Sequence, residues 1–181
     1  MGSDKALLPL GDSTFLRTLI ETFLTRLDPV VVVLGHHASE IRATVRTDPR
    51  VRLVTNEDYD RGMLSSLQTG LRAVEMDSGV VFTLVDHPGV RAETLAMVVE
   101  AFEEGVQTAA IPRYEGERGH PVAISPQLGA ELLALPPDSS PKSVMRNAYS
   151  KARFVDVDDP AVVEDIDTPA RYRSLVAQPP S

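Results

Sequence analysis

A continuous run of β-branched residues from Val30 to Val33, ending in Leu34 and Gly35, most strongly limits the folds open to this chain. Such an unbroken apolar run is typical of a strand covered on both faces, as strands are in parallel sheets. Apolar residues recur at helical spacing from Phe15 to Leu27, and helix and strand patterns alternate after the run. The sequence therefore predicts an α/β fold with a mostly parallel sheet.

The other expected elements follow from apolar spacing and from turn and capping residues. Helices are predicted near 39–45, 64–74, 95–102 and 169–176, with two more around the Pro-rich stretch 136–141, and strands at 51–54, 80–85, 106–111, 122–124 and 153–157. Residues 112–120 predict a turn or hairpin arm. There is no internal repeat and no linker, so residues 1–176 are expected to form a single domain with a flexible tail at 177–181.

The amino-acid composition and the net charge exclude several kinds of site and partner. The chain has 181 residues, 43% of them apolar, which is enough for a full core. It contains no cysteine, so disulfides, thiolate nucleophiles and cysteine zinc sites are excluded. A net charge of -8 argues against nucleic acid as a partner. Without a membrane-spanning run or a leader pattern, we expect a cytoplasmic protein with no membrane partner.

Asp86 is the first candidate site residue. The apolar run at 80–85 stops at Asp86-His87-Pro88, so the carboxylate is expected at the carboxyl edge of a buried strand. Ligand sites of open α/β sheets lie at that edge. A simple turn, which Asp also favours before X-Pro, explains the same residues equally well.

A second acidic cluster extends from Asp156 to Asp167, with six acidic residues in twelve. Its last acid comes directly before the expected helix at 169–176, where the helix dipole alone favours negative charge. If the sheet brings Asp86 and Asp167 together, their oxygens form a site suited to Mg²⁺ and substrate phosphates. That site predicts phosphoryl or nucleotidyl transfer.

Polar residues at 56–66 lead into a helix start that carries Ser65 and Ser66. Free backbone N–H groups and the two hydroxyls can hold a phosphate, a ribose or a base edge. Serines at helix starts also act simply as caps.

Three further features have ordinary explanations when taken alone. Lys5 fits a solvated surface charge, and His120 fits a surface turn between Gly119 and Pro121. The pair His36-His37 with Glu40 has a spacing known from metal sites but equally fits a solvated loop. We assign that group no function from the sequence.

Short motifs in a fixed order add a resemblance to this picture. They are Met1-Gly2-Ser3-Asp4-Lys5-Ala6-Leu7-Leu8-Pro9-Leu10-Gly11, Gly62-Met63-Leu64-Ser65-Ser66-Leu67, Asp86-His87-Pro88, Gly119-His120-Pro121-Val122 and Asp165-Ile166-Asp167-Thr168-Pro169. Across nearly the whole chain, they resemble the molybdenum cofactor nucleotidyltransferases of the MobA-like NTP transferase family, most closely the cytidylyltransferase branch. The resemblance implies a three-layer α/β/α Rossmann-like fold.

The resemblance also implies a role for each motif. Catalytic roles fall to Lys5, Asp86 and Asp167, Mg²⁺ binding to Asp86 and Asp167, nucleotide binding to Lys5, Gly62, Ser65 and Ser66, and acceptor binding to His87, Gly119, His120 and Pro121. The expected reaction passes CMP from CTP to the terminal phosphate of molybdopterin and releases pyrophosphate. A molybdenum hydroxylase apoenzyme is a further expected partner.

The chain departs from the family pattern at two places. Many members have Gln where this chain has His87, which affects the acceptor contacts. The family also opens with a strand and a Gly-rich loop of the form Leu-Ala-Ala-Gly-x-Ser-x-Arg-Met-Gly, of which this sequence has only Met1-Gly2. That loop cradles the triphosphate and helps to choose the base. We therefore expect upstream codons to encode it, and the chain as given to bind CTP weakly.

Two alternatives to cytidylyl transfer remain open at this stage. A related enzyme could use GTP or accept a sugar phosphate. A chain without the phosphate loop could also be a non-catalytic accessory protein that binds the pterin cofactor or a molybdenum enzyme.

Overall fold

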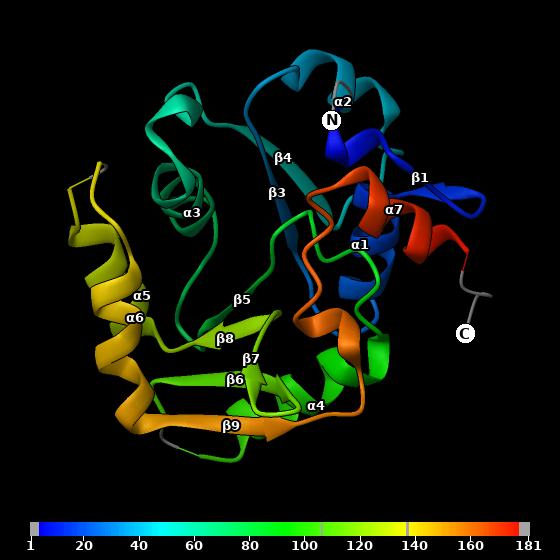
Figure 1. The fold of residues 1–181 in the computed structure, drawn as a ribbon. Coiled ribbons are helices and arrows are strands. Elements are labelled where there is room, and N and C mark those ends of the chain that lie inside the picture. Colours follow the sequence, from blue (N-terminus) through cyan, green and yellow to red (C-terminus); the bar gives the residue numbers. More distant parts are fainter. Residues whose placement is uncertain (1–3, 106, 137, 178–181) are drawn as a thin grey trace.

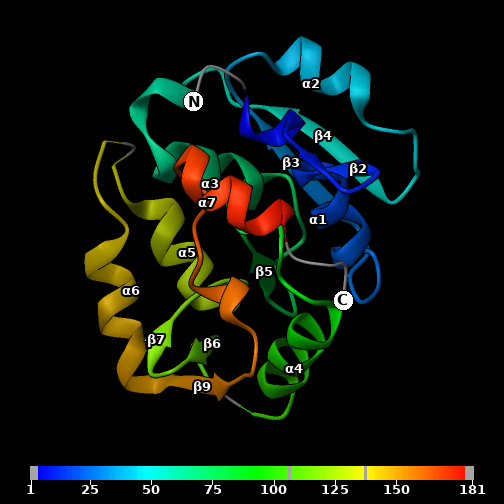
Figure 2. The same ribbon diagram turned by 45° about the vertical axis from the view of Figure 1, so that its right-hand side comes forward.

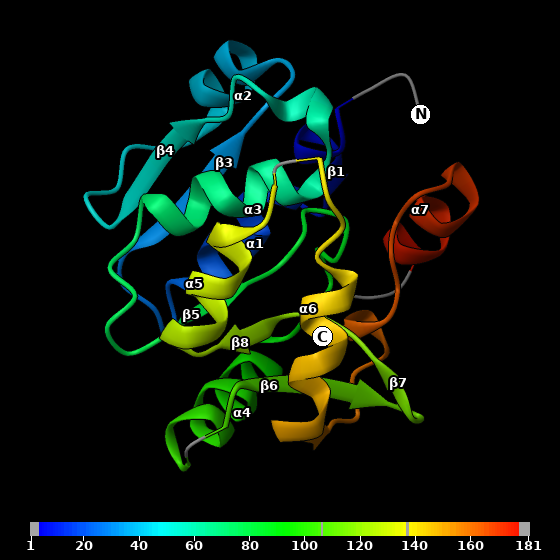
Figure 3. The same cartoon turned by 90° about the vertical axis from the view of Figure 1, so that its left-hand side faces the viewer.

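The computed structural model describes residues 4–105, 107–136 and 138–177. These residues form three layers, with strands between two groups of helices (Figures 1 and 2). Helices α3 (Met63–Arg72), α5 (Pro126–Ala134) and α6 (Lys142–Ala148) lie on one side, which faces the viewer in Figure 3. Helices α1 (Phe15–Phe23) and α4 (Ala92–Glu103) lie on the other side. The predicted three-layer α/β fold is confirmed.

The first strand pair is the one that the β-branched run predicts. Strand β3 (Val30–Leu34) runs parallel to β4 (Val51–Thr55). Val30, Val32 and Leu34 are buried, and the residues between them are half-buried. The strand is thus covered on both faces, as an unbroken apolar sequence requires.

The second group of strands has mixed directions. Strand β6 (Ala109–Tyr114) pairs antiparallel with β7 (Glu117–Arg118) and β8 (Val122–Ile124), and β8 pairs antiparallel with β5 (Val80–Phe82). Only β9 (Ala152–Asp156) runs parallel to β6 within this group. The expectation of a mostly parallel sheet therefore holds for β3 with β4 and for β6 with β9.

A β-hairpin accounts for the antiparallel pairing of β6 with β7. Glu115 and Gly116 have φ values of 48° and 87°, which lets the chain reverse between β6 and β7. Strands joined by so short a turn can only pair antiparallel. The prediction of a turn or hairpin arm at 112–120 is confirmed, although β6 itself continues to Tyr114.

Two expected strands are shorter in the structure. Strand β5 ends at Phe82 and not at Val85, because residues 83–85 have no neighbouring strand in the described parts of the chain. Strand β6 begins at Ala109, and the expected start at residue 106 lies outside the described residues. Most of the expected 177–181 tail is also outside them.

The remaining elements are short. They are β1 (Pro9–Leu10), β2 (Ser13–Thr14), α2 (Ala38–Thr44), α7 (Pro169–Val176) and 3₁₀ turns at Lys5–Leu7, Tyr59–Arg61, Tyr149–Lys151 and Pro160–Val162. In the described residues, no helix has both the length and the apolar character needed to cross a membrane.

Helix α7 packs against the N-terminal part of the chain. The Tyr172 ring lies 5.9 Å from the Phe15 ring, and its hydroxyl donates to the Pro9 carbonyl at 3.0 Å. Thr168 caps the helix, as its sequence predicts. The residue before this cap, Asp167, is thereby brought to the N-terminal segment.

A large cavity separates the two strand groups. Its volume is about 1910 Å³, and it is lined by residues 30–35, which include β3, and by residues 79–86, which include β5, with residues of α1 and α3 also in the lining. Strands β3 and β5 pair on their outer edges, with β4 and β8, and not with each other. Both inner edges face this cavity, and unpaired edges of this kind are ready to pair with a further strand.

The cavity generates a prediction about stability. An N-terminal extension that adds an apolar strand and a Gly-rich loop is expected to pair with β3 and β5 and to bury its side chains between α1 and α3. Because each buried Val- or Leu-sized side chain stabilises by about 1.5–3 kcal/mol before ordering costs, we expect the melting temperature to rise by about 5–10 °C.

Calorimetry of the extended and unextended chains measures this rise. An extension of equal length made only of Gly and Ser is the control and should leave the melting temperature nearly unchanged. Equal melting temperatures for both extensions would show that the cavity does not accept a strand.

Candidate functional site

Asp86 lies four residues after the end of β5, in the turn that leads to Pro88. Its backbone carbonyl accepts a hydrogen bond from the N–H of Ile166 at 2.9 Å. This bond fixes the acidic segment before α7 to the end of the β5 segment. It is the local reason why two acids far apart in the sequence come together.

The two predicted acids meet at Lys5. The Lys5 ammonium lies 3.6 Å from Asp86 Oδ2 and forms an ion pair with Asp167 Oδ1. The Asp86 side chain is 20% exposed and that of Asp167 50%, so the group lies at a solvent-facing edge. Each of the three residues comes from a different part of the chain.

One oxygen of this group lacks a partner. Asp86 Oδ1 is buried and accepts no hydrogen bond from the described residues, since the His87 Nε2 atom is 3.7 Å away. A buried carboxylate oxygen without a partner is costly. A divalent cation fits the site, because both carboxylates already converge on one positive centre and hard cations prefer oxygen ligands.

Two histidines lie beside the acids. The rings of His87 and His120 are 4.9 Å apart, and Phe82 meets His120 edge-on at 5.8 Å. Burial, and secondly the neighbouring His87, lowers the pKa of His120 to about 4. His120 is therefore neutral near pH 7. The sequence suggested a surface turn here, whereas Nδ1 of His120 is buried and has no hydrogen-bond partner in the described residues.

Gly119 holds this histidine against the C-terminal segment. A Cβ atom at residue 119 would lie 1.9 Å from the Val162 carbonyl oxygen, so only glycine fits. The next N–H, that of His120, donates to the same oxygen at 2.9 Å. Pro121 is fully buried. Close packing therefore fixes the Gly-His-Pro motif, and Gly119 and His120 line the cavity.

The two serines in the first turn of α3 differ in their surroundings. The Ser65 hydroxyl is buried, accepts from Asn56 Nδ2 and lies 2.9 Å from the carbonyls of Asp58 and Gly62. It therefore holds the loop in shape. Ser66 also accepts from Asn56, at 3.0 Å, and lines the large cavity.

The cavity brings together part of the predicted set. Its lining includes Lys5, Ser66, Asp86, Gly119 and His120, and does not include Gly62, Ser65, His87, Pro121 and Asp167. Asp167 reaches the same place through its ion pair with Lys5.

A cationic wall that the sequence analysis missed also lines the cavity. It consists of Arg118 on β7 and of Lys142 and Arg146 on α6. None of the three pairs with a carboxylate within residues 4–105, 107–136 and 138–177. The i,i+4 spacing of Lys142 and Arg146, which puts both on one helix face, was the available signal.

Known proteins resemble this chain in sequence. A family model described as "MobA-like NTP transferase domain" matches residues 1–153. Nicotine blue oxidoreductase of Paenarthrobacter nicotinovorans is 30% identical over 179 residues, covering 94% of this chain and 87% of that protein. Molybdenum cofactor cytidylyltransferase of Escherichia coli is 25% identical over 171 residues, covering 93% and 85%.

Solved structures agree with the sequence matches. The crystal structure of Rv0371c from Mycobacterium tuberculosis has a TM-score of 0.83 and 28% identity, covering 98% of this chain and 91% of that chain. A complex of the same protein with manganese has a TM-score of 0.79, 29% identity and coverages of 98% and 94%.

The buried histidine predicts how stability depends on pH. The folded-state pKa of His120, about 4, lies below the ordinary value of 6.5, so between these values only the unfolded chain binds the proton. The stability that the folded state gains from keeping His120 neutral is complete above pH 6.5 and is lost as the pH falls toward 4. Between pH 7 and pH 4.5, we expect the free energy of unfolding to fall about 2 kcal/mol less in His120→Phe than in the wild type.

Chemical denaturation at both pH values measures this difference. If the two proteins lose the same free energy on acidification, His120 is not the group responsible.

Proposed function

Because the chain belongs to the MobA-like NTP transferase family, we propose that it passes CMP from CTP to the terminal phosphate of a molybdopterin-type cofactor. The nucleotidyltransferase class is that of the family, while the base and the acceptor are our proposal. The observation that carries it is the convergence of Asp86 and Asp167 on Lys5 at the edge of the cavity.

The reaction needs no protein nucleophile. An oxygen of the acceptor phosphate bonds to the α-phosphorus of the nucleotide, the bond to the β-phosphate oxygen breaks, and pyrophosphate leaves with the electron pair. The protein has to align the two anionic groups and stabilise the charge that develops between them. Lys5 supplies positive charge where the phosphates are expected.

Asp86 and Asp167 would hold a divalent ion, which we propose to be Mg²⁺. When bound, the ion would neutralise phosphate charge and orient the phosphates. The partnerless oxygen of Asp86 supports this role, as does the manganese complex of the Mycobacterium tuberculosis relative. Lys5 would then move from the carboxylates to the phosphates, because the ion takes its place as their positive partner.

We expect different parts of the cavity lining to bind the nucleotide and the acceptor. Gly62 and the first turn of α3, with Ser66 in the cavity lining, would supply donors and acceptors for base and ribose. Gly119 and His120 in the cavity lining would face the pterin, with Pro121 and His87 packed behind them. Arg118, Lys142 and Arg146 are placed to bind the phosphate of that acceptor.

Another relative favours a second candidate. The 30% identical protein is named nicotine blue oxidoreductase, so a redox reaction is the second candidate for this chain. Two carboxylates around a lysine suit metal-bound phosphates better than hydride transfer, and we retain nucleotidyl transfer. GTP use, a sugar-phosphate acceptor and an accessory role toward a molybdenum hydroxylase apoenzyme are the remaining alternatives.

Substitution of the acids tests the main proposal. Asp86→Asn and Asp167→Asn should each lower the rate of Mg²⁺-dependent pyrophosphate release from CTP and molybdopterin about 100-fold or more, because each removes one of the two charged metal ligands. Circular dichroism should show an unchanged fold.

Asp165→Asn is the matched control, because this nearby acid pairs with Arg171 instead of Lys5. It should keep most of the activity. Wild-type rates in Asp86→Asn or Asp167→Asn would contradict the metal role. No pyrophosphate release by the wild type with CTP, GTP or either acceptor class would contradict the transferase proposal itself.

The cationic wall gives a separate prediction. The double variant Lys142→Ala/Arg146→Ala should raise the KM for the phosphorylated acceptor about tenfold or more and leave the KM for the nucleotide within about twofold. Lys151→Ala, outside the cavity lining, is the control for loss of charge alone. An equal rise in both KM values would argue against a wall dedicated to the acceptor.

A further inference from the structure

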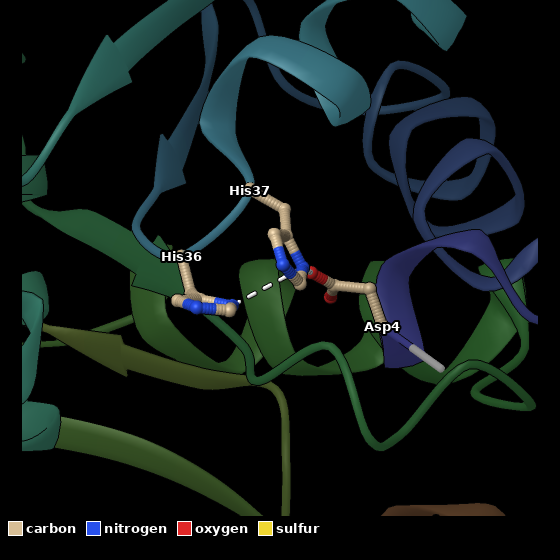
Figure 4. A group of neighbouring side chains, drawn as sticks. All are labelled: Asp4, His36 and His37. Carbon is tan, nitrogen blue, oxygen red and sulfur yellow. Dashed lines mark hydrogen bonds and ion pairs between the residues drawn. The ribbon is translucent and has the colours of Figure 1, made fainter. Parts of the chain in front are cut away.

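Asp4, His36 and His37 form a compact group at the end of β3 that shares no residue with the pair Asp86 and Asp167. Figure 4 shows their side chains pointing toward one another, from the N-terminal segment and from the turn after β3. His36 Nδ1 lies 3.1 Å from His37 Nδ1, which lies 3.3 Å from Asp4 Oδ2. One ligand atom from each residue lies within 4.8 Å of the other two.

The three side chains cannot form a continuous hydrogen-bond chain in which His37 Nδ1 accepts from His36 and donates to Asp4. The His37 Nδ1 atom has either one proton or one lone pair in the ring plane. If it donates to Asp4, it cannot also accept from His36, and if it accepts from His36, it faces the carboxylate with a lone pair. A cation placed among the three atoms satisfies all of them at once, because both imidazoles then offer lone pairs.

The backbone holds the two rings together. His37 has φ 56° and ψ 28°, a left-handed conformation that is uncommon for a residue other than glycine. His36 follows Gly35, where a Cβ atom would lie 2.7 Å from Cβ of Tyr59, and its ring meets the Tyr59 ring at 5.7 Å. The turn is thus fixed by packing, and a non-glycine residue in a strained conformation often marks a functional site.

We propose that Asp4, His36 and His37 bind a divalent transition-metal ion of the zinc type. Ligands about 2.0–2.1 Å from a tetrahedral ion lie about 3.3 Å from one another, close to the spacing of these atoms. Imidazole nitrogens select zinc, cobalt, nickel or copper over Mg²⁺, which prefers oxygen ligands only. Three protein ligands leave a fourth position for water.

The proposed ion would join two separate parts of the chain. Asp4 precedes Lys5, whose ammonium contacts Asp86 and Asp167, while both histidines follow β3. Binding would therefore fix the segment that carries Lys5 to the end of β3. The two proposed ions use different ligands, so binding of this ion can be measured without the proposed reaction.

Metal titration tests the proposal on the tag-free full chain after treatment with a chelator. We expect Zn²⁺ binding by calorimetry, and visible absorption of bound Co²⁺ that Zn²⁺ displaces. His36→Ala and His37→Ala should each raise the Zn²⁺ Kd about tenfold or more. Zn²⁺ should raise the melting temperature of the wild type and not that of His37→Ala.

Two controls separate this site from other sources of affinity. Glu40→Gln removes an exposed acid one turn into α2 that is not in the group, and should leave the Kd within about twofold. The double variant Asp86→Asn/Asp167→Asn should also retain the Zn²⁺ site. An unchanged Kd in His37→Ala, no binding by the wild type, or loss of the site only in Asp86→Asn/Asp167→Asn would each overturn the proposal.

Discussion

The contact of Lys5 with Asp86 and Asp167 joins the first residues of the chain, its middle and its C-terminal segment at one point. Partly exposed ion pairs contribute only about 0–1 kcal/mol, so this contact does not hold the segments in place by itself. The hydrogen bond from Ile166 to Asp86 and the packing of α7 on Phe15 do so. The scaffold therefore imposes a costly arrangement, with one buried carboxylate oxygen left unpaired, and such an arrangement is expected where a ligand completes the site.

Charge is distributed unevenly around the large cavity. The protein has a net charge of -8, and the proposed nucleotide and acceptor are both anionic, so their binding would depend on local positive charge. Lys5 supplies it on the acidic edge, while Arg118, Lys142 and Arg146 supply it on the cationic wall. Between them, the neutral ring of His120 adds no charge of its own. This separation is what a two-substrate transfer requires, because each phosphate group meets its own cations.

The two proposed metal sites differ in chemistry. Asp86 and Asp167 offer oxygen ligands near the expected phosphates, whereas Asp4, His36 and His37 offer two nitrogens and one oxygen at the end of β3. Ligand type alone separates a hard ion from a transition metal. Asp4 directly precedes Lys5 in the sequence, so an ion bound by Asp4, His36 and His37 would also restrict the position of Lys5 beside Asp86 and Asp167.

The sequence by itself determined the α/β class, the two strands β3 and β4, the capped start of α7 and the choice of Asp86 and Asp167 as candidates, because apolar periodicity, capping and turn chemistry are local properties. Only the tertiary structure decided the mixed strand directions, the burial of His120 and the cationic wall, since each depends on which distant segments pack together. The same holds for Asp4 and His37, whose contact depends on how the N-terminal segment crosses the end of β3. Sequence spacing suggested Glu40 as the partner of these histidines, but the carboxylate beside them belongs to a residue 33 positions from His37.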